Sequence, residues 1–177
     1  MDDAYRRTRD TAPAIDVAEC TPDLLRALES AMPSQHHRAR YGVQTAGHGV
    51  YFVARLGERP AGHGLLRWQP TDQIIRQSSA AEPCIEALGV DPPMQSRGLG
   101  TALIVACEGA VLGRGCSTIG LAVGIDNQRA RSLYERLGYR DIGVAPFEIT
   151  WSYVDAEGAV RTGREVCIYM RKRLSAV

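Results

Sequence analysis

The stretch EALGVDPPMQSRGLGTALI, residues 86–104, contains the change of pattern that decides the fold. Its first residues belong to a compact apolar run, 84–90, which is typical of a strand in the interior of a sheet. Pro92 and Pro93 end that strand, because proline offers no backbone N–H to a sheet. A glycine-containing turn follows, and apolar residues then recur at helical spacing over about 98–112. The sequence therefore predicts a buried strand that leads through a glycine turn into a helix.

The turn between this strand and this helix is suited to an anion. The first N–H groups of a helix have no intrahelical acceptors, and the positive end of the helix dipole lies there. Gly98 and Gly100 lack the Cβ atoms that would block a phosphate, and Arg97 can add a charge-assisted hydrogen bond. The alternative is a tight strand-to-helix turn without a ligand. The P-loop pattern and the GxGxxG dinucleotide pattern are absent, which disfavours nucleotide hydrolysis and dinucleotide binding.

The remaining sequence indicates a mixed α/β chain with no internal repeat. We expect a flexible tail at residues 1–12 and a single domain at 13–175. Polar residues dominate 33–47, where the pattern permits a helix. His36 and His37 are expected at the surface, and the alternative is that they line a substrate site. The other expected elements are a strand at 15–17, a helix from 21, a hairpin at 50–68, a polar loop at 69–82, a strand at 117–125, a helix from 127 to 137, and β segments at 139–151 and 165–174.

Composition excludes several classes of protein. The chain has 177 residues, 45% hydrophobic and 23% charged, so one folded domain is expected rather than a disordered or fibrous chain. A net charge of +1 disfavours nucleic-acid and anionic-membrane binding. The five cysteines have no metal-ligand spacing, which predicts neither a disulfide scaffold nor a metal site. The absence of a leader and of a long apolar run predicts a soluble, cytoplasmic protein.

Two side chains are candidates for chemistry on grounds of placement. By strand alternation Glu86 shares a face with Leu88 and Val90, where a carboxylate is costly unless it is paired with an arginine or used in catalysis. Tyr134 lies at the edge of the apolar stripe of its helix, where the phenol can reach a cleft while the ring packs. The alternative for Tyr134 is packing alone. Asn127 precedes that helix and is a favoured N-cap.

Two motifs carry a resemblance to a known family. Val90-x-Pro92-x-x-Gln95-x-x-Gly98-x-Gly100 resembles the V-x-P-x-x-[RQ]-x-x-G-x-[GA] signature of the GCN5-related N-acetyltransferase (GNAT) family. Further along, Asn127-x-x-Ala130-x-x-Leu133-Tyr134-x-x-Leu137-Gly138-Tyr139 is similar to that family's N-x-x-A-x-x-L-Y-x-x-x-G-[FY] helix. The order and separation of the motifs make the pair specific. The resemblance covers residues 84–140 as motif and about 14–174 as element order.

The resemblance implies a central mixed, mostly antiparallel twisted sheet, splayed at its middle strands and flanked by helices. It also implies acetyl-CoA as acyl donor and no metal. The pyrophosphate would lie on the amides of residues 95–101, and the pantetheine would pair with a bulged strand in which Gly89 suits the bulge. The residues implied for acetyl-CoA are Leu88, Gly89, Val90, Gln95, Ser96, Arg97, Gly98, Leu99, Gly100, Thr101, Asn127 and Tyr134.

The same resemblance implies the roles of the catalytic residues. Glu86 would be the general base, directly or through water, Tyr134 the general acid to the CoA thiolate, and a backbone N–H at or near Leu88 the oxyanion donor. The implied activity is acetyl transfer by direct attack of a primary amine of a small molecule or peptide. The alternative is a non-catalytic acyl-CoA-binding or sensing module. Strands at 147–154 and 165–172 could pair across a homodimer.

Overall fold

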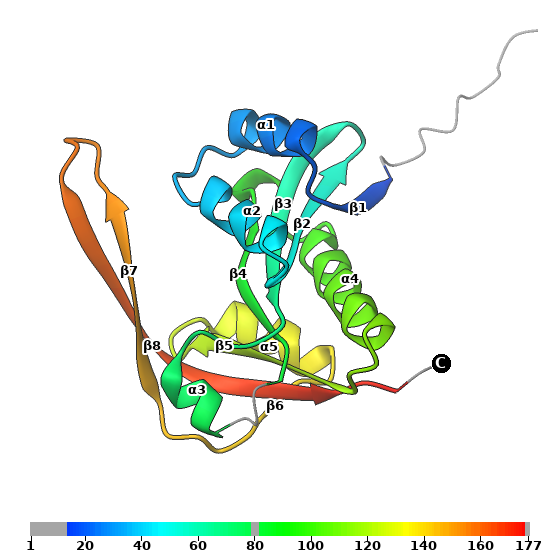
Figure 1. The fold of residues 1–177 in the computed structure, drawn as a ribbon, viewed down its shortest axis with the longest axis vertical. Helices are drawn as coiled ribbons and strands as arrows, with labels where there is room; N and C mark the ends of the chain where they lie inside the picture. Colours follow the sequence, from blue (N-terminus) through cyan, green and yellow to red (C-terminus); the bar gives the residue numbers. More distant parts are fainter. Residues whose placement is uncertain (1–13, 79–81, 176–177) are drawn as a thin grey trace, which may run out of the picture.

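The computed structural model describes residues 14–78 and 82–175, so the tail predicted at 1–12 lies outside the described residues (Figure 1). The elements are, in chain order, β1 (Ile15–Glu19), α1 (Pro22–Ala31), α2 (His37–Thr45), β2 (Gly49–Leu56), β3 (Arg59–Arg67), α3 (Gln73–Ser78), β4 (Cys84–Val90), the 3-10 turn η1 (Pro92–Met94), α4 (Leu99–Gly113), β5 (Thr118–Gly124), α5 (Gln128–Arg136), β6 (Arg140–Asp141), β7 (Phe147–Val154) and β8 (Val160–Arg173). The predicted central strand and the helix after it are confirmed.

The strands form one sheet in the order β1-β2-β3-β4-β5-β8-β6, with β7 paired to β8. Among these pairings only β4 with β5 is parallel. That pair is joined only at Cys84↔Gly120 and Ile85↔Leu121, so the two strands have no pairing toward their carboxyl ends. The sheet is therefore mixed, mostly antiparallel and open at its middle strands, as predicted.

Helices cover both faces of the sheet. Alternation in β2 sends Val50 and Phe52 to the cluster that contains α4 and α5, and Tyr51 and Val53 to the cluster that contains α1. We call the first face the α4 face and the second the α1 face. Short α3 packs on the α1 face near β8, where Ile75 forms a further small cluster with Phe147, Cys167 and Tyr169. Leu103 of α4 is fully buried, which contributes about 2 kcal/mol through removal of its side chain from water.

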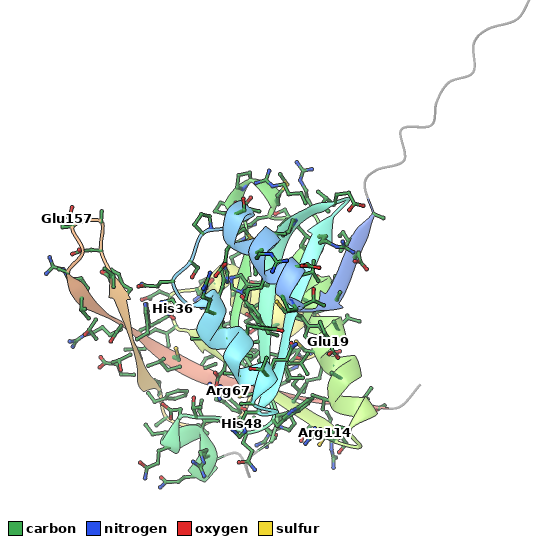
Figure 2. All side chains as sticks on the ribbon, turned by 45° about the horizontal axis from the view of Figure 1, so that its top comes forward. Glu19, His36, His48, Arg67, Arg114 and Glu157 are labelled. Carbon is green, nitrogen blue, oxygen red and sulfur yellow. The ribbon has the colours of Figure 1, made fainter. Side chains whose placement is uncertain are left out.

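The β7–β8 hairpin extends beyond the rest of the sheet on the side where α1 and α2 lie (Figure 1). Glu157 lies at its tip (Figure 2). The N–H of Val154 donates to Oε1 of Gln35 at 3.1 Å, so the hairpin contacts the segment between α1 and α2. This contact joins residues that are far apart in sequence.

Two expectations were wrong in detail. The loop expected at 69–82 contains the short helix α3. His37 is not at the surface but fully buried, because its ring nitrogens find partners in the Tyr51 hydroxyl at 2.7 Å and the Met32 carbonyl at 2.6 Å. A buried imidazole is tolerated where both nitrogens are hydrogen-bonded, and residue type alone does not reveal those partners.

Candidate active site

A β-bulge in β4 determines which face of the sheet each side chain of the candidate site occupies. Leu65 pairs with Glu86 and His63 pairs with Gly89, so one more residue stands on β4 than on β3 between these pairs. The extra residue allows Ala87 to adopt a φ of 50°, a conformation that non-glycine residues rarely occupy. The chain direction is kept, but the alternation of side chains shifts by one.

This bulge overturns the expectation that Glu86 shares a face with Leu88 and Val90. Leu88 and Val90 pack against the hydrophobic cluster on the α4 face. Glu86 points to the α1 face, where it contacts Cys84 and Arg67. Strand alternation fails here because the inserted residue reverses the sides beyond it.

Gly89 was expected to form the bulge, and this expectation was wrong, since the bulge lies at Ala87. The absence of a side chain at Gly89 has another cause. A Cβ there would lie 2.8 Å from Nε2 of His63, which packs against the strand from β3. Gly89 is therefore required for the close packing of an imidazole ring.

A pocket of about 500 Å³ opens on the α4 face between β4, the glycine turn and α5. Of the twelve residues that the resemblance implies for acetyl-CoA binding, eleven border this pocket in the described structure. Arg97 does not; its side chain is exposed outside the pocket. The residues around the pocket are Leu88, Gly89, Val90, Gln95, Ser96, Gly98, Leu99, Gly100, Thr101, Asn127, Arg129, Ala130, Leu133, Tyr134 and Arg136.

Several backbone N–H groups without acceptors in the described structure lie together at the glycine turn of this pocket. Ser96 and Gly98 have positive φ values of 62° and 91°, which turn the chain sharply into α4. The first backbone hydrogen bond of the helix runs from Ala102 to Gly98. The N–H groups of residues 96–101 donate to no other residue that the structure describes. Together with the positive end of the helix dipole, these groups can bind an anion such as a diphosphate.

Arg129 adds a positive charge to this part of the pocket. From α5 it donates to Oε1 of Gln95 at 2.6 Å and to Oγ of Ser96 at 2.9 Å. Gln95 in turn donates to the carbonyl of Val90 at 3.2 Å, so the turn is tied to both β4 and α5. Sequence reasoning missed Arg129, and its position two residues after Asn127 in the second motif was the only available signal. Arg136 of α5 also borders the pocket and was missed.

Tyr134 borders the same pocket, and its side chain is buried. Burial, and then the negative charge of Glu165, raise the pKa of Tyr134 to about 12. The phenol is therefore neutral at physiological pH and can donate a proton. Asn127 caps α5, with Oδ1 accepting from the N–H of Ala130 at 3.1 Å, and it borders the pocket as well.

Glu86 lies outside this pocket. Its carboxylate accepts from Nε of Arg67 at 2.8 Å and from the hydroxyl of Thr71 at 3.3 Å. The ion pair considered from the sequence is therefore present, and its acidic side chain is 31% exposed. Arg67 and Thr71 border a separate pocket of about 440 Å³, which His48 and Arg114 also line. Figure 2 shows His48, Arg67 and Arg114 near one another.

A sequence model of the acetyltransferase (GNAT) family matches residues 18–139, more than half of the chain. The matched segment includes every residue around the 500 Å³ pocket. The chain belongs to the acetyltransferase (GNAT) family. This finding confirms the resemblance that the two motifs carry.

The relatives of this GNAT chain include two mycothiol acetyltransferases. That of Beutenbergia cavernae is 40% identical over 70 residues, which are 40% of this chain and 24% of that protein. That of Clavibacter michiganensis subsp. michiganensis is 42% identical over 60 residues, which are 34% of this chain and 20% of that protein. The matched part of the chain thus spans a quarter or less of the length of these relatives.

Solved structures share the fold of this GNAT chain. The ribosomal-protein-S18-alanine N-acetyltransferase of Escherichia coli has a TM-score of 0.62 and 20% identity, over 93% of this chain and 96% of that chain. A GNAT family acetyltransferase from Elizabethkingia anophelis with acetyl-CoA bound has a TM-score of 0.57 and 17% identity, over 90% of this chain and 98% of that chain. The predicted fold class is confirmed. None of the helices within 14–78 and 82–175 is long and apolar enough to cross a bilayer.

Proposed function

We propose that this GNAT chain is an acetyl-CoA-dependent N-acetyltransferase whose acceptor, a primary amine of a small molecule or peptide, attacks the thioester directly. The observation that carries the proposal is a single pocket that is bordered both by free backbone N–H groups and by the buried Tyr134. The N–H groups suit the diphosphate of CoA, and the phenol suits a leaving thiolate. Family membership supports the acyl donor.

Different residues of the pocket would bind the acyl donor, stabilise the oxyanion and donate the proton. The amides of residues 96–101 and the guanidinium of Arg129 would hold the diphosphate, and the open strand edge at Leu88 to Val90 would hold the pantetheine. A backbone N–H at or near Leu88 would stabilise the oxyanion. As the C–S bond breaks, Tyr134 would give its proton to the sulfur, so that free thiol leaves.

Glu86 is proposed as the general base, acting through water. The β-bulge supports this role in one respect, because it places the carboxylate on the face of β4 opposite to the pocket that would hold the acyl donor. An acceptor would approach from that face. Replacement of Glu86 by Gln should lower kcat about 100-fold if the carboxylate takes the proton. Unchanged kcat would leave Glu86 with the ion pair to Arg67 alone.

The first test measures binding and transfer in the same preparation. Acetyl-CoA and CoA are titrated calorimetrically, and thiol release is then screened over a panel of amines. Micromolar binding with amine-dependent release supports the proposal, whereas binding without release by any amine supports the acyl-CoA-sensing alternative. Absence of binding refutes both.

The second test concerns the proton donor. Tyr134→Phe removes only the hydroxyl, so kcat should fall about 100-fold while the Kd of acetyl-CoA stays within a factor of two. A variant with unchanged kcat would restrict Tyr134 to packing. The single domain at 13–175, the cytoplasmic location and the homodimer stay predictions from the sequence.

A further inference from the structure

The side chain of Glu165 lies over the end of β5. A Cβ built on Gly124 would be 1.9 Å from Oε1 of Glu165, so the carboxylate occupies the space that a side chain at this position would fill. Gly124 pairs with Cys167 at the last step of the β5–β8 ladder, and β8 continues past it into the hairpin. The acidic group is thus held at the carboxyl end of β5, where β4 has already separated from it.

This carboxylate has no protein partner among the described residues. The structure gives its oxygens neither a hydrogen bond nor an ion pair. Two arginines of the same part of β8 have other partners: Arg161 pairs with Asp155 at 2.7 Å, and Arg164 with Glu148 at 4.0 Å. Glu165 is exposed, so its carboxylate is open to a cation from solution.

Glu165 and Tyr134 approach the end of β5 from opposite faces. Leu121 and Val123 of β5 belong, like Tyr134, to the hydrophobic cluster on the α4 face. Ala122, two residues before Gly124, packs against the small cluster that contains Ile75, on the α1 face. Gly124 shares that face by alternation, and Glu165 covers it. Burial, and then the negative charge of Glu165, raise the pKa of Tyr134, so the two groups interact electrostatically.

An aromatic surface adjoins the carboxylate on the same face of the hairpin. The register pairs Ile149 with Glu165 and Trp151 with Gly163, and residues two apart on a strand share a face. The indole of Trp151 lies across Gly163, where a Cβ would be 2.3 Å from Cε2. Trp151 is 43% exposed. A carboxylate beside an exposed indole is suited to a cation that carries an apolar group.

We propose that Glu165 binds the ammonium group of the acceptor and Trp151 its apolar substituent, so that the substrates are cationic amines with an apolar or aromatic group. This inference rests on the proposed acetyltransferase function. An acyl donor in the pocket of the α4 face would present its thioester between β4 and β5, with Tyr134 on one side and the acceptor held by Glu165 on the other. The bound ammonium would first give one proton through water to Glu86, and the neutral nitrogen would then attack the thioester. A carboxylate on the acceptor, next to its amine, would be repelled by Glu165.

The test uses a matched pair of acceptors, L-phenylalaninamide and L-phenylalanine, which differ in the negative charge beside the amine. Initial rates of thiol release with saturating acetyl-CoA give KM and kcat for the wild type, Glu165→Gln and Glu148→Gln. Glu148 is the control because it lies on the same hairpin but on the opposite face, paired with Val166. The Kd of acetyl-CoA, measured by titration, reports the folding of each variant.

For the wild type we expect a lower KM with the amide than with the amino acid. Glu165→Gln should raise the KM of the amide about tenfold, with a much smaller change in kcat, and should reduce the preference between the two acceptors. Glu148→Gln should keep the wild-type values. If the wild type releases thiol but Glu165→Gln leaves the KM of the amide unchanged, this inference alone is overturned. The same holds if Glu165→Gln and Glu148→Gln raise that KM equally. No release by the wild type with any amine overturns the proposed function as well.

Discussion

The imidazole of His63 should make the stability of the protein depend on pH. Its ring is buried between β3 and β4, with the ring of His37 at 5.0 Å and that of Tyr51 at 5.8 Å between centroids. Nδ1 has no hydrogen-bond partner in the described structure. Burial, and then the positive charges of Arg40 and His37, lower the pKa of His63 from 6.5 to about 3.

The sign and size of the effect follow from proton linkage. Since the folded state keeps His63 neutral down to about pH 3, only the unfolded chain binds a proton between pH 6.5 and that value. The stabilisation is therefore fully present above pH 6.5 and is lost as the pH falls. Between pH 7.5 and pH 5, protonation of His63 in the unfolded chain favours the unfolded state by a factor of about 30. This factor lowers the free energy of unfolding by about 2 kcal/mol.

Urea denaturation at pH 7.5 and pH 5 measures this loss. His63→Leu removes the titrating group, so its free energy of unfolding should fall between the two pH values by about 2 kcal/mol less than that of the wild type. Each protein is compared with itself, so the packing change cancels. His48→Asn, at an exposed position, is the control and should keep the wild-type difference. An equal pH dependence in His63→Leu and the wild type would refute the reasoning.

Three further predictions concern other contacts. Ala87 is exposed at a φ of 50°, so Ala87→Val should lower the free energy of unfolding by about 1 to 2 kcal/mol in urea, whereas Ala87→Gly should not lower it. Arg129→Met should weaken CoA binding about tenfold by titration but leave pantetheine, which lacks the diphosphate, unaffected. Glu108→Gln should lower the free energy of unfolding, measured in urea, by about 2 kcal/mol, because Lys172 Nζ lies 2.8 Å from that mostly buried carboxylate. Adding Lys172→Met should restore part of this loss.

The sequence by itself determined the parts of the fold that depend on neighbours along the chain. The run from Cys84 to Val90 and the helix from Leu99 were predicted within a residue, because apolar spacing, prolines and glycines act locally. The anion-binding turn, followed along the sequence by the motif around Tyr134, also indicated the family. Those residues meet around one pocket because the crossover from β4 through α4 to β5 brings α5 beside the turn.

Tertiary structure alone decided which face each side chain occupies and which partner it meets. The bulge at Ala87, whose register depends on β3, turned Glu86 away from Leu88 and Val90. Burial of His37 depends on the Tyr51 hydroxyl, which arrives from another element. Glu165 lies over Gly124 only because β8 pairs with β5 across the sheet. Such contacts join distant residues, and no local pattern encodes their register, so they become visible only when the strands are assembled.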